Sequence, residues 1–345
     1  MLIVSFTLYF CTIWASYTAN KTKQPIEIPI HFGAEYTIPK DNLLTVEGIA
    51  LGKKLFFDTQ LSRNNTISCA ICHQEKLAFS DGKTTSIGID AQLNKRNAPS
   101  LANLLWQNKF FWDGRAKTLE EQVLHPLFAK NEMDNDSTTL AAKLQNTAYA
   151  TLFKKTFKKQ NITNQLISKA LAQYVRSLIS ANSRYDKIVL GIVNPTPREK
   201  RAISLFFTHP IPEMNIRGGN CGDCHGSNLT TLGTFHDNGL DSIPTDVGLG
   251  AITNKKTDIG KMKVPSLRNV ALTKPYMHDG RFSTLRQVMT HYNHQIKNSP
   301  NLDPLIAQAS NEIEGTSLAL TESEQDDILF FLEMLTDSSF VKLAR

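Results

Sequence analysis

The sequence predicts a mostly α-helical protein made of two tandem copies of one unit, and three observations predict this fold. Several segments are apolar at helical spacing, as in residues 165–180 (QLISKALAQYVRSLIS). Short motifs occur twice, in the same order and at one constant separation. A box with the pattern Cys-x-x-Cys-His occurs once in each copy, at residues 69–73 and 221–225.

Four segments have the clearest helical pattern. They are residues 47–57 (EGIALGKKLFF), 165–180, 198–207 (REKRAISLFF) and 322–335. At the start of the last segment, Thr321 and Glu324 form a candidate capping box. We expect the segments 165–180 and 322–335 to close the first and the second unit respectively.

The internal repeat is ungapped over its central part. Its paired segments are 97–101 (NAPSL) with 263–267 (KVPSL), 112–115 (WDGR) with 278–281 (HDGR), and 118–119 with 284–285. All three pairs have the same separation, so no insertion or deletion lies between them. The tripeptide Leu-Phe-Phe also precedes each box. The chain is therefore predicted to be a duplicated unit.

Four of the five cysteines lie in the two boxes. Cys-x-x-Cys-His is the attachment signature of c-type haem, in which two thiols hold the haem covalently and the histidine binds the iron. The residues expected to hold two covalently bound haem c groups are Cys69, Cys72, His73, Cys221, Cys224 and His225. The units are therefore predicted to be tandem cytochrome c-like domains, each with one haem.

Two other uses of these cysteines are a zinc site made from both pairs and a set of two disulfides. A zinc site does not require a histidine directly after the second cysteine of each pair. A thioredoxin-like dithiol is also disfavoured, because neither box lies in a βαβ pattern.

The first 16 residues (MLIVSFTLYFCTIWAS) are uncharged and too short to span a bilayer comfortably. We interpret residues 1–19 as a signal peptide that sends the protein to the periplasm, with cleavage near Ala15 to Ala19. An uncleaved N-terminal membrane anchor is the alternative. A lipoprotein cysteine at Cys11 is disfavoured by the bulky residues before it.

The remaining chain divides into two predicted domains, residues 35–190 and 191–345. The linker at residues 191–197 contains two prolines, which stop a helix. Residues 80–95 and 226–261 lack periodicity, and loops of this length are unusual unless they have a function. We expect them to pack over haem edges. The net charge of +6 comes with no long basic run, so no nucleic-acid partner is expected.

Eight segments carry a resemblance to a known family: LGKKLFFD, SCAICH, TSIG, RNAPSL, FWDGRAKTLEEQ, NCGDCH, KVPSLRN and PYMHDGRFSTL. From Ile38 onward the chain resembles the bacterial dihaem cytochrome c peroxidases, including the MauG-type enzymes that use two c haems to oxidise protein tryptophan. The resemblance implies that residues 35–190 form the peroxidatic domain and residues 191–345 the electron-transfer domain.

The family pattern also places a Trp, a Gln and a Glu at equal spacing, matched here by Trp112, Gln122 and Glu132. The resemblance implies that Trp112 relays electrons between the haems and that the other two line the open face of the first iron. Splitting hydrogen peroxide requires a proton to move between its oxygens, and a positioned carboxylate can accept and return it. The catalytic role of Glu132 rests on its spacing from Trp112 and Gln122, which matches the family pattern. Without that match, Glu132 would be interpreted as an exposed residue in a polar loop.

The resemblance further implies one calcium ion between the haems. Its ligands would be the Asn97 side chain and the backbone carbonyls of Lys263 and Pro265. Such hard oxygen donors suit calcium.

The sequence departs from the peroxidases that carry a second histidine on the first haem in the pattern SIGH, because Ile89 stands at that position. Isoleucine cannot bind iron, so we expect the first iron to be open without prior reduction. On the second haem, many members use a distal Met, whereas here the matching position is Tyr292, as in MauG-type proteins. A phenolate would lower the iron potential. The competing ligands are Met289, His291, His294, Met277 and His278.

The function predicted from these features is the reduction of hydrogen peroxide to water, with electrons from a small periplasmic cytochrome c or cupredoxin. The alternative is a MauG-like enzyme that oxidises tryptophan in a protein substrate, which the Ile89 and Tyr292 positions favour. A non-catalytic electron-transfer protein is a third class, disfavoured by Glu132 and Gln122. A homodimer of this chain is a possible assembly.

Overall fold

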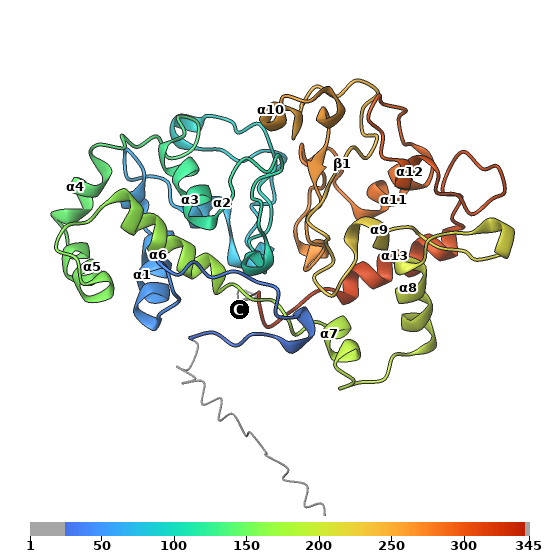
Figure 1. Ribbon diagram of the computed structural model, residues 1–345, viewed down its shortest axis with the longest axis horizontal. Coiled ribbons are helices and arrows are strands. Elements are labelled where there is room, and N and C mark those ends of the chain that lie inside the picture. Colours follow the sequence, from blue (N-terminus) through green and yellow to red (C-terminus); the bar gives the residue numbers. More distant parts are fainter. Residues whose placement is uncertain (1–24, 342–345) are drawn as a thin grey trace, which may run out of the picture.

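The computed structural model describes residues 25–341, so the predicted signal peptide at residues 1–19 lies outside the described residues. The fold is mostly helical, as the sequence predicts, with one small sheet. Figure 1 shows the earlier helices gathered in one half of the molecule and the later ones in the other. Within residues 25–341, no helix is both long enough and apolar enough to cross a membrane.

Within the described residues, the first half contains six α-helices in addition to short 3-10 helices. They are α1 (Val46–Phe56), α2 (Cys69–Cys72), α3 (Leu119–Phe128), α4 (Leu140–Gln145), α5 (Tyr149–Phe157) and α6 (Asn164–Arg176). Helix α6 is the centre of this half, since both α1 and α3 pack on it. Gly52 permits the close approach of α1, because a Cβ atom there would meet the Ala170 carbonyl. Arg176 of α6 forms a bidentate ion pair with Glu120 of α3.

The second half contains the remaining elements. They are α7 (Arg184–Val189), α8 (Pro197–Phe207), α9 (Gly222–His225), α10 (Gly250–Thr253), α11 (Leu285–His294), α12 (Pro304–Ala307), α13 (Glu322–Met334) and the antiparallel strands β1 (Phe235–His236) and β2 (Met262–Lys263). Helix α13 packs on α8 and α11. A separate hydrophobic cluster, which includes Phe206, Ile328 and Phe331, forms the core of this half.

All four helices expected from the sequence are present. They are α1, α6, α8 and α13, and each begins at a threonine whose side chain accepts a hydrogen bond from the first turn. The capping box of Thr321 and Glu324 is confirmed. Helix α6 ends at Arg176 rather than Ser180, because the backbone N–H of Ser180 donates to Asn103 Oδ1. The loop at residues 226–261 is less irregular than expected, since it contains β1 and α10.

The duplication is visible in the backbone. Asn103 and Asn269 are both left-handed, with φ of 60° and 63°, and each precedes a short 3-10 helix. The isolated bridge Phe110–Ala116 has a counterpart in Tyr276–Phe282. Thr118 and Thr284 then cap α3 and α11 in the same way. Each of these pairs has the separation of the sequence motifs, so the repeated motifs fold alike.

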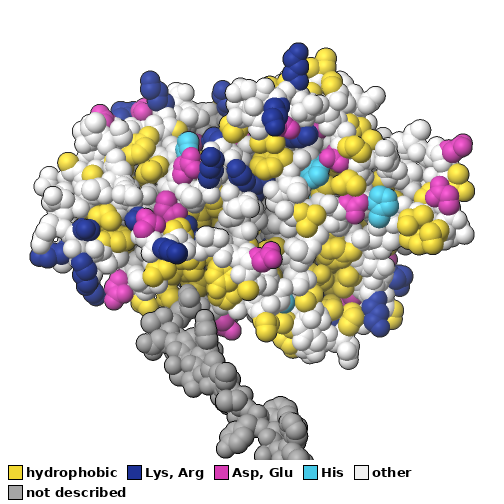
Figure 2. All heavy atoms as spheres, in the orientation of Figure 1, with side chains coloured by type: hydrophobic (Ala, Val, Ile, Leu, Met, Phe, Trp, Pro, Cys, Tyr) yellow, Lys and Arg dark blue, Asp and Glu magenta, His cyan; other side chains and the backbone are white. Residues whose placement is uncertain are grey.

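Charged side chains of both signs are interspersed on the face of the molecule shown in Figure 2. A buried ion pair lies within the second half, between Asp186 of α7 and Arg268. The guanidinium of Arg268 contacts both carboxylate oxygens of Asp186 at 2.6 and 2.7 Å, and neither side chain is exposed. The N-terminal segment joins this pair, because His31 Nε2 lies 2.7 Å from Asp186 and the Phe32 ring lies against Arg268.

We predict that Asp186→Asn lowers the free energy of unfolding by about 3–5 kcal/mol, because the buried Arg268 loses its counter-charge. The measurement is guanidinium denaturation of the haem-loaded protein followed by circular dichroism. Asp326→Asn is the matched control, since Asp326 pairs with Arg286 on the surface and an exposed pair contributes less than about 1 kcal/mol. Equal effects of the two substitutions would contradict the prediction.

Candidate functional site

A cavity with a volume of about 810 Å³ lies beside the first box, and we call it the first cavity. Cys69, Cys72 and His73 form part of its wall. Much of the remaining wall comes from residues 94–102, 110–113 and 131–133 and from α3. The second half contributes residues 245–247, Lys263, Pro265, Ser266 and Arg268. The cavity is within the range of about 300–1,000 Å³ usual for ligand and cofactor sites.

The second cavity has a volume of about 230 Å³ and lies beside the second box, with Cys221, Cys224 and His225 in its wall. The two cavities share a wall, which we call the common wall. It consists of residues 97–100, Trp112, Lys263, Pro265 and Ser266, which line both cavities.

Each box histidine is held by a backbone carbonyl. His73 Nδ1 lies 2.8 Å from the Phe79 oxygen, and His225 Nδ1 lies 3.1 Å from the Pro265 oxygen. Burial lowers the pKa of both imidazoles, that of His225 to about 4, so both are neutral at pH 7. A neutral imidazole that donates from Nδ1 has Nε2 free for a metal, which is the arrangement that haem iron requires.

The four box thiols are free in the described chain. Burial raises the pKa of Cys69 and Cys221 to about 12 and that of Cys72 and Cys224 to about 11. The two pairs face different cavities, so they do not form one zinc site with four cysteine ligands. The donor set of each cavity, two thiols and one neutral imidazole, therefore fits a covalently attached c-type haem.

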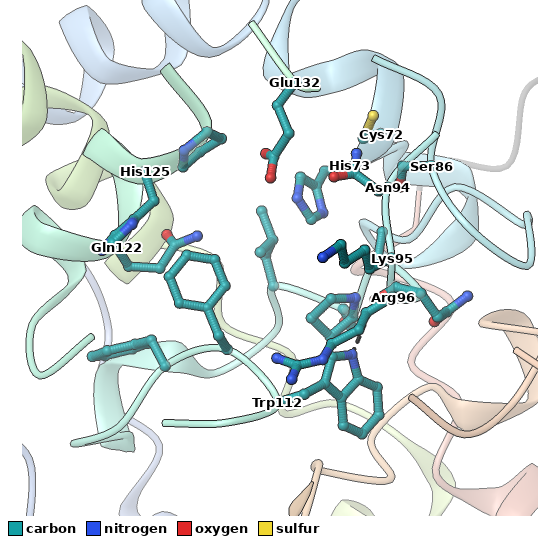
Figure 3. Close-up of a pocket in the computed structure, with 18 of the residues that line it drawn as sticks. Cys72, His73, Ser86, Asn94, Lys95, Arg96, Trp112, Gln122, His125 and Glu132 are labelled. Carbon is teal, nitrogen blue, oxygen red and sulfur yellow. Dashed lines mark hydrogen bonds between the residues drawn. The ribbon is translucent and has the colours of Figure 1, made fainter. Parts of the chain in front are cut away.

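The three residues predicted to be catalytic all line the first cavity. Figure 3 shows the Glu132 carboxylate and the Gln122 amide pointing into the space in front of the His73 ring, with Trp112 on the side of the common wall. Burial raises the pKa of Glu132, and the nearby Arg115 guanidinium partly opposes this. The structure thus brings together side chains from four separate segments of the first half.

The loop that carries Glu132 is fixed against residues 88–94. The Ile89 N–H donates to the Glu132 carbonyl at 2.8 Å, and Asn131 Nδ2 donates to Asn94 Oδ1 at 2.7 Å. Gly88 permits this approach, since a Cβ atom there would collide with the Asn131 carbonyl. Gly88 lines the cavity, whereas the Ile89 side chain is buried outside the lining.

Trp112 lies in the common wall and is held from both sides. Its indole N–H donates to the Asn97 carbonyl at 3.0 Å, and its own carbonyl accepts from the Lys263 N–H at 2.7 Å. The His278 ring packs edge-on against the indole with centroids 6.5 Å apart. The indole is thus placed between the two cavities by residues of both halves.

The predicted calcium ligands also lie in the common wall. The amide nitrogen of Asn97 donates to the Lys83 carbonyl at 2.7 Å, which leaves the amide oxygen as the atom for a cation. The Pro265 carbonyl accepts from His225, and a carbonyl oxygen has a second lone pair. The calcium site stays a prediction.

The side chain of Lys263 was not among the predicted site residues, since only the backbone carbonyl of Lys263 was predicted as a calcium ligand. Its ammonium lies 3.1 Å from Gln107 Oε1, and burial lowers its pKa to about 8. No carboxylate within residues 25–341 pairs with it. The repeat offered a signal, since Lys263 is the counterpart of Asn97 and so places a cation where the first copy has an amide.

The structure separates the candidate distal ligands of the second haem. Tyr292, Met289, Met277 and His278 line the second cavity, whereas His294 is exposed outside its lining. His291 is buried, and its Nε2 lies 3.0 Å from the Asn238 carbonyl. His236 is also engaged through both ring nitrogens, with Asp303 and Thr234. Burial raises the pKa of Tyr292 to about 12, and a hydrogen bond from Asn238 opposes this.

Comparisons with known proteins agree with this site. A family model for di-haem cytochrome c peroxidases matches residues 46–194. The MauG methylamine utilization protein of Methylophilus methylotrophus is 33% identical over 97% of this chain and 94% of its own. The cytochrome c551 peroxidase of Nitrosomonas europaea is 34% identical over 69% of this chain and 70% of its own. The crystal structure of a MauG-like protein associated with microbial copper homeostasis superposes with a TM-score of 0.81 at 32% identity, covering 90% of this chain and 95% of that one.

We predict that replacing Cys69 and Cys72 together by alanine removes one covalently bound haem and leaves the other. Both thioether bonds of the first cavity are lost, while the second box is unchanged. Intact-protein mass spectrometry under denaturing conditions measures the number of bound haems. Ser68→Ala, next to the box, is the control and should keep both haems. Two haems on the double variant would contradict the assignment of the first box.

Proposed function

This chain belongs to the di-haem cytochrome c peroxidase and MauG family, and on that premise we propose that it reduces hydrogen peroxide to water in the first cavity. Membership makes it an oxidoreductase with two c-type haems. The observation that carries the proposal is the position of Glu132. Its carboxylate points into the cavity that His73 faces, so Glu132 could exchange a proton with a peroxide bound in that cavity.

Cys69, Cys72 and His73 would hold the first haem, which would supply the redox chemistry that the side chains lack. Glu132 accepts the proton of one peroxide oxygen and returns it to the other, which leaves as water. Gln122 orients the peroxide through its amide. A full turnover takes up two electrons and two protons and yields two waters.

Electrons reach the first cavity through the common wall in this proposal. Trp112 is the aromatic side chain that lines both cavities, and hydrogen bonds fix it from both halves. The second haem, held by His225, would receive electrons from a small cytochrome c or cupredoxin in the periplasm. A calcium ion at Asn97, Lys263 and Pro265 would hold the two halves together at this wall.

A second candidate function is the oxidation of tryptophan in a partner protein, as in MauG-type enzymes. Two observations favour it. The Ile89 backbone is hydrogen-bonded to the loop that carries Glu132. The isoleucine side chain does not line the first cavity and has no group that could bind the first iron. Tyr292 lines the second cavity, where a phenolate would lower the iron potential. The two functions share the first cavity and differ in the source of the electrons.

We predict that Glu132→Gln slows peroxide reduction by roughly 100- to 10,000-fold while both haems stay attached, because the amide cannot shuttle the proton. The wild-type rate should fall as the pH drops through the raised pKa of Glu132, since protonation removes the acceptor. This acidic limb should be missing from the variant. Steady-state assays with a reduced cytochrome c across pH measure both effects.

Glu121→Gln is the matched control, because Glu121 is an exposed carboxylate on α3 outside the cavity lining. It should retain the wild-type rate and the acidic limb. A wild-type rate in Glu132→Gln would remove Glu132 from the mechanism.

We further predict that the fully oxidised protein reacts with one equivalent of hydrogen peroxide without any reductant. The physical reason is that Ile89 cannot close the first iron. Stopped-flow absorption should show a fast change at both haems. If the reaction starts only after one electron is added, another residue closes the first iron and the enzyme is reductively activated. Reduced cytochrome c, reduced cupredoxin or a candidate protein substrate is then added to the reacted protein. The additive that restores the spectrum of the oxidised protein identifies the electron source and so separates the two functions.

A further inference from the structure

A single amide contacts two of the candidate ligands in the second cavity. Asn238 Nδ2 donates to the Tyr292 oxygen at 3.0 Å and lies 3.7 Å from the Met277 sulfur. All three residues line the cavity together with His225. The amide of Asn238 therefore contacts both a candidate oxygen ligand and a candidate sulfur ligand.

The loop that carries Asn238 is held rigidly. Its carbonyl accepts from His291 Nε2 at 3.0 Å, so this buried histidine braces the loop. Asp237 is buried, and its carboxylate accepts from the Gly239 N–H at 3.0 Å and from the Ser299 hydroxyl at 2.6 Å. The amide is thus positioned by contacts on both sides, independently of Tyr292.

The hydrogen bond has the direction expected for a bound phenolate. The Tyr292 oxygen accepts from Asn238, and no acceptor within residues 25–341 receives the hydroxyl proton of Tyr292. Hydrogen bonds donated to an anionic oxygen are shorter and stronger than neutral ones. A thioether sulfur is only a weak acceptor, so the same amide favours Met277 far less.

We propose that Asn238 is a positioning residue that keeps Tyr292, rather than Met277, on the iron of the second haem. This inference rests on the proposed function, in which Tyr292 is the distal ligand. The amide holds the phenolate oxygen by a hydrogen bond, and it gives the Met277 sulfur only a weak one.

The test is Asn238→Leu, which keeps the size of the side chain and removes the amide. The two haems of the purified protein are followed by absorption and electron paramagnetic resonance spectra and by redox titration. The expected result is a thioether-ligated spectrum and a rise in the reduction potential of the second haem, since a Met ligand raises the potential. The first haem should be unchanged. In Asn238→Leu/Met277→Leu the rise should disappear.

Asn301→Leu is the control, because Asn301 donates to backbone carbonyls of the same half and lies outside the cavity lining. Asn238→Ser provides the same comparison if the leucine variant does not fold. A wild-type second haem in the folded variant, or any shift that persists without Met277, overturns the proposal.

Tyr292→Phe separates this inference from its premise. An unchanged second-haem spectrum in Tyr292→Phe shows that Tyr292 is not the ligand and overturns the inference together with that assignment. The peroxide reaction of the first cavity is measured in the same samples, so a failure of the proposed peroxidase function is seen independently of the second haem.

Discussion

The hydrogen bond between each box histidine and a backbone carbonyl is the interaction on which both cavities depend. It fixes the imidazole with Nε2 toward the cavity and, with burial, keeps the ring neutral. The carbonyl for His225 belongs to Pro265, in the repeated Pro-Ser-Leu motif, whose first-copy counterpart is Pro99. In the second copy, the motif that makes the duplication visible therefore also orients the box histidine, whereas in the first copy the Phe79 carbonyl does so.

The same motifs build the common wall, so the orientation of the two sites is coupled to the packing of the two halves. Arg96 bridges Asp113 of the first half and Asp246 of the second. The ammonium of Lys263, in contrast, has only an amide oxygen as partner within the described chain. The hydrogen bond from the Lys263 N–H to the Trp112 carbonyl crosses the common wall, and the ion pairs of Arg96 beside it join the same two halves. These contacts hold the two cavities next to each other.

The sequence was sufficient for the parts of the molecule that local patterns determine. The helices follow from apolar periodicity and threonine caps, and the haem boxes from the spacing of the cysteines. The position of Glu132 needed the resemblance to a family, because a single acidic residue in a polar loop has no local signature. Tyr292 could be proposed as the distal ligand from its position in the family pattern, and that assignment stays a prediction. Its hydrogen-bond partner Asn238 could not be predicted, because Asn238 lies in the segment 226–261 that has no periodicity.

The duplication also explains why the two cavities differ. At the separation of the repeated motifs, the counterpart of Tyr292 on α11 is Pro126 on α3, and both residues line their cavities. Proline has no side-chain group that binds iron, whereas tyrosine has a phenolic oxygen. Likewise Gln122, which faces the space in front of His73, corresponds to the apolar Val288. In the proposed function, this helix position would leave the first cavity open for a small substrate and would offer a Tyr292 ligand in the second, so one backbone plan would give two different sites.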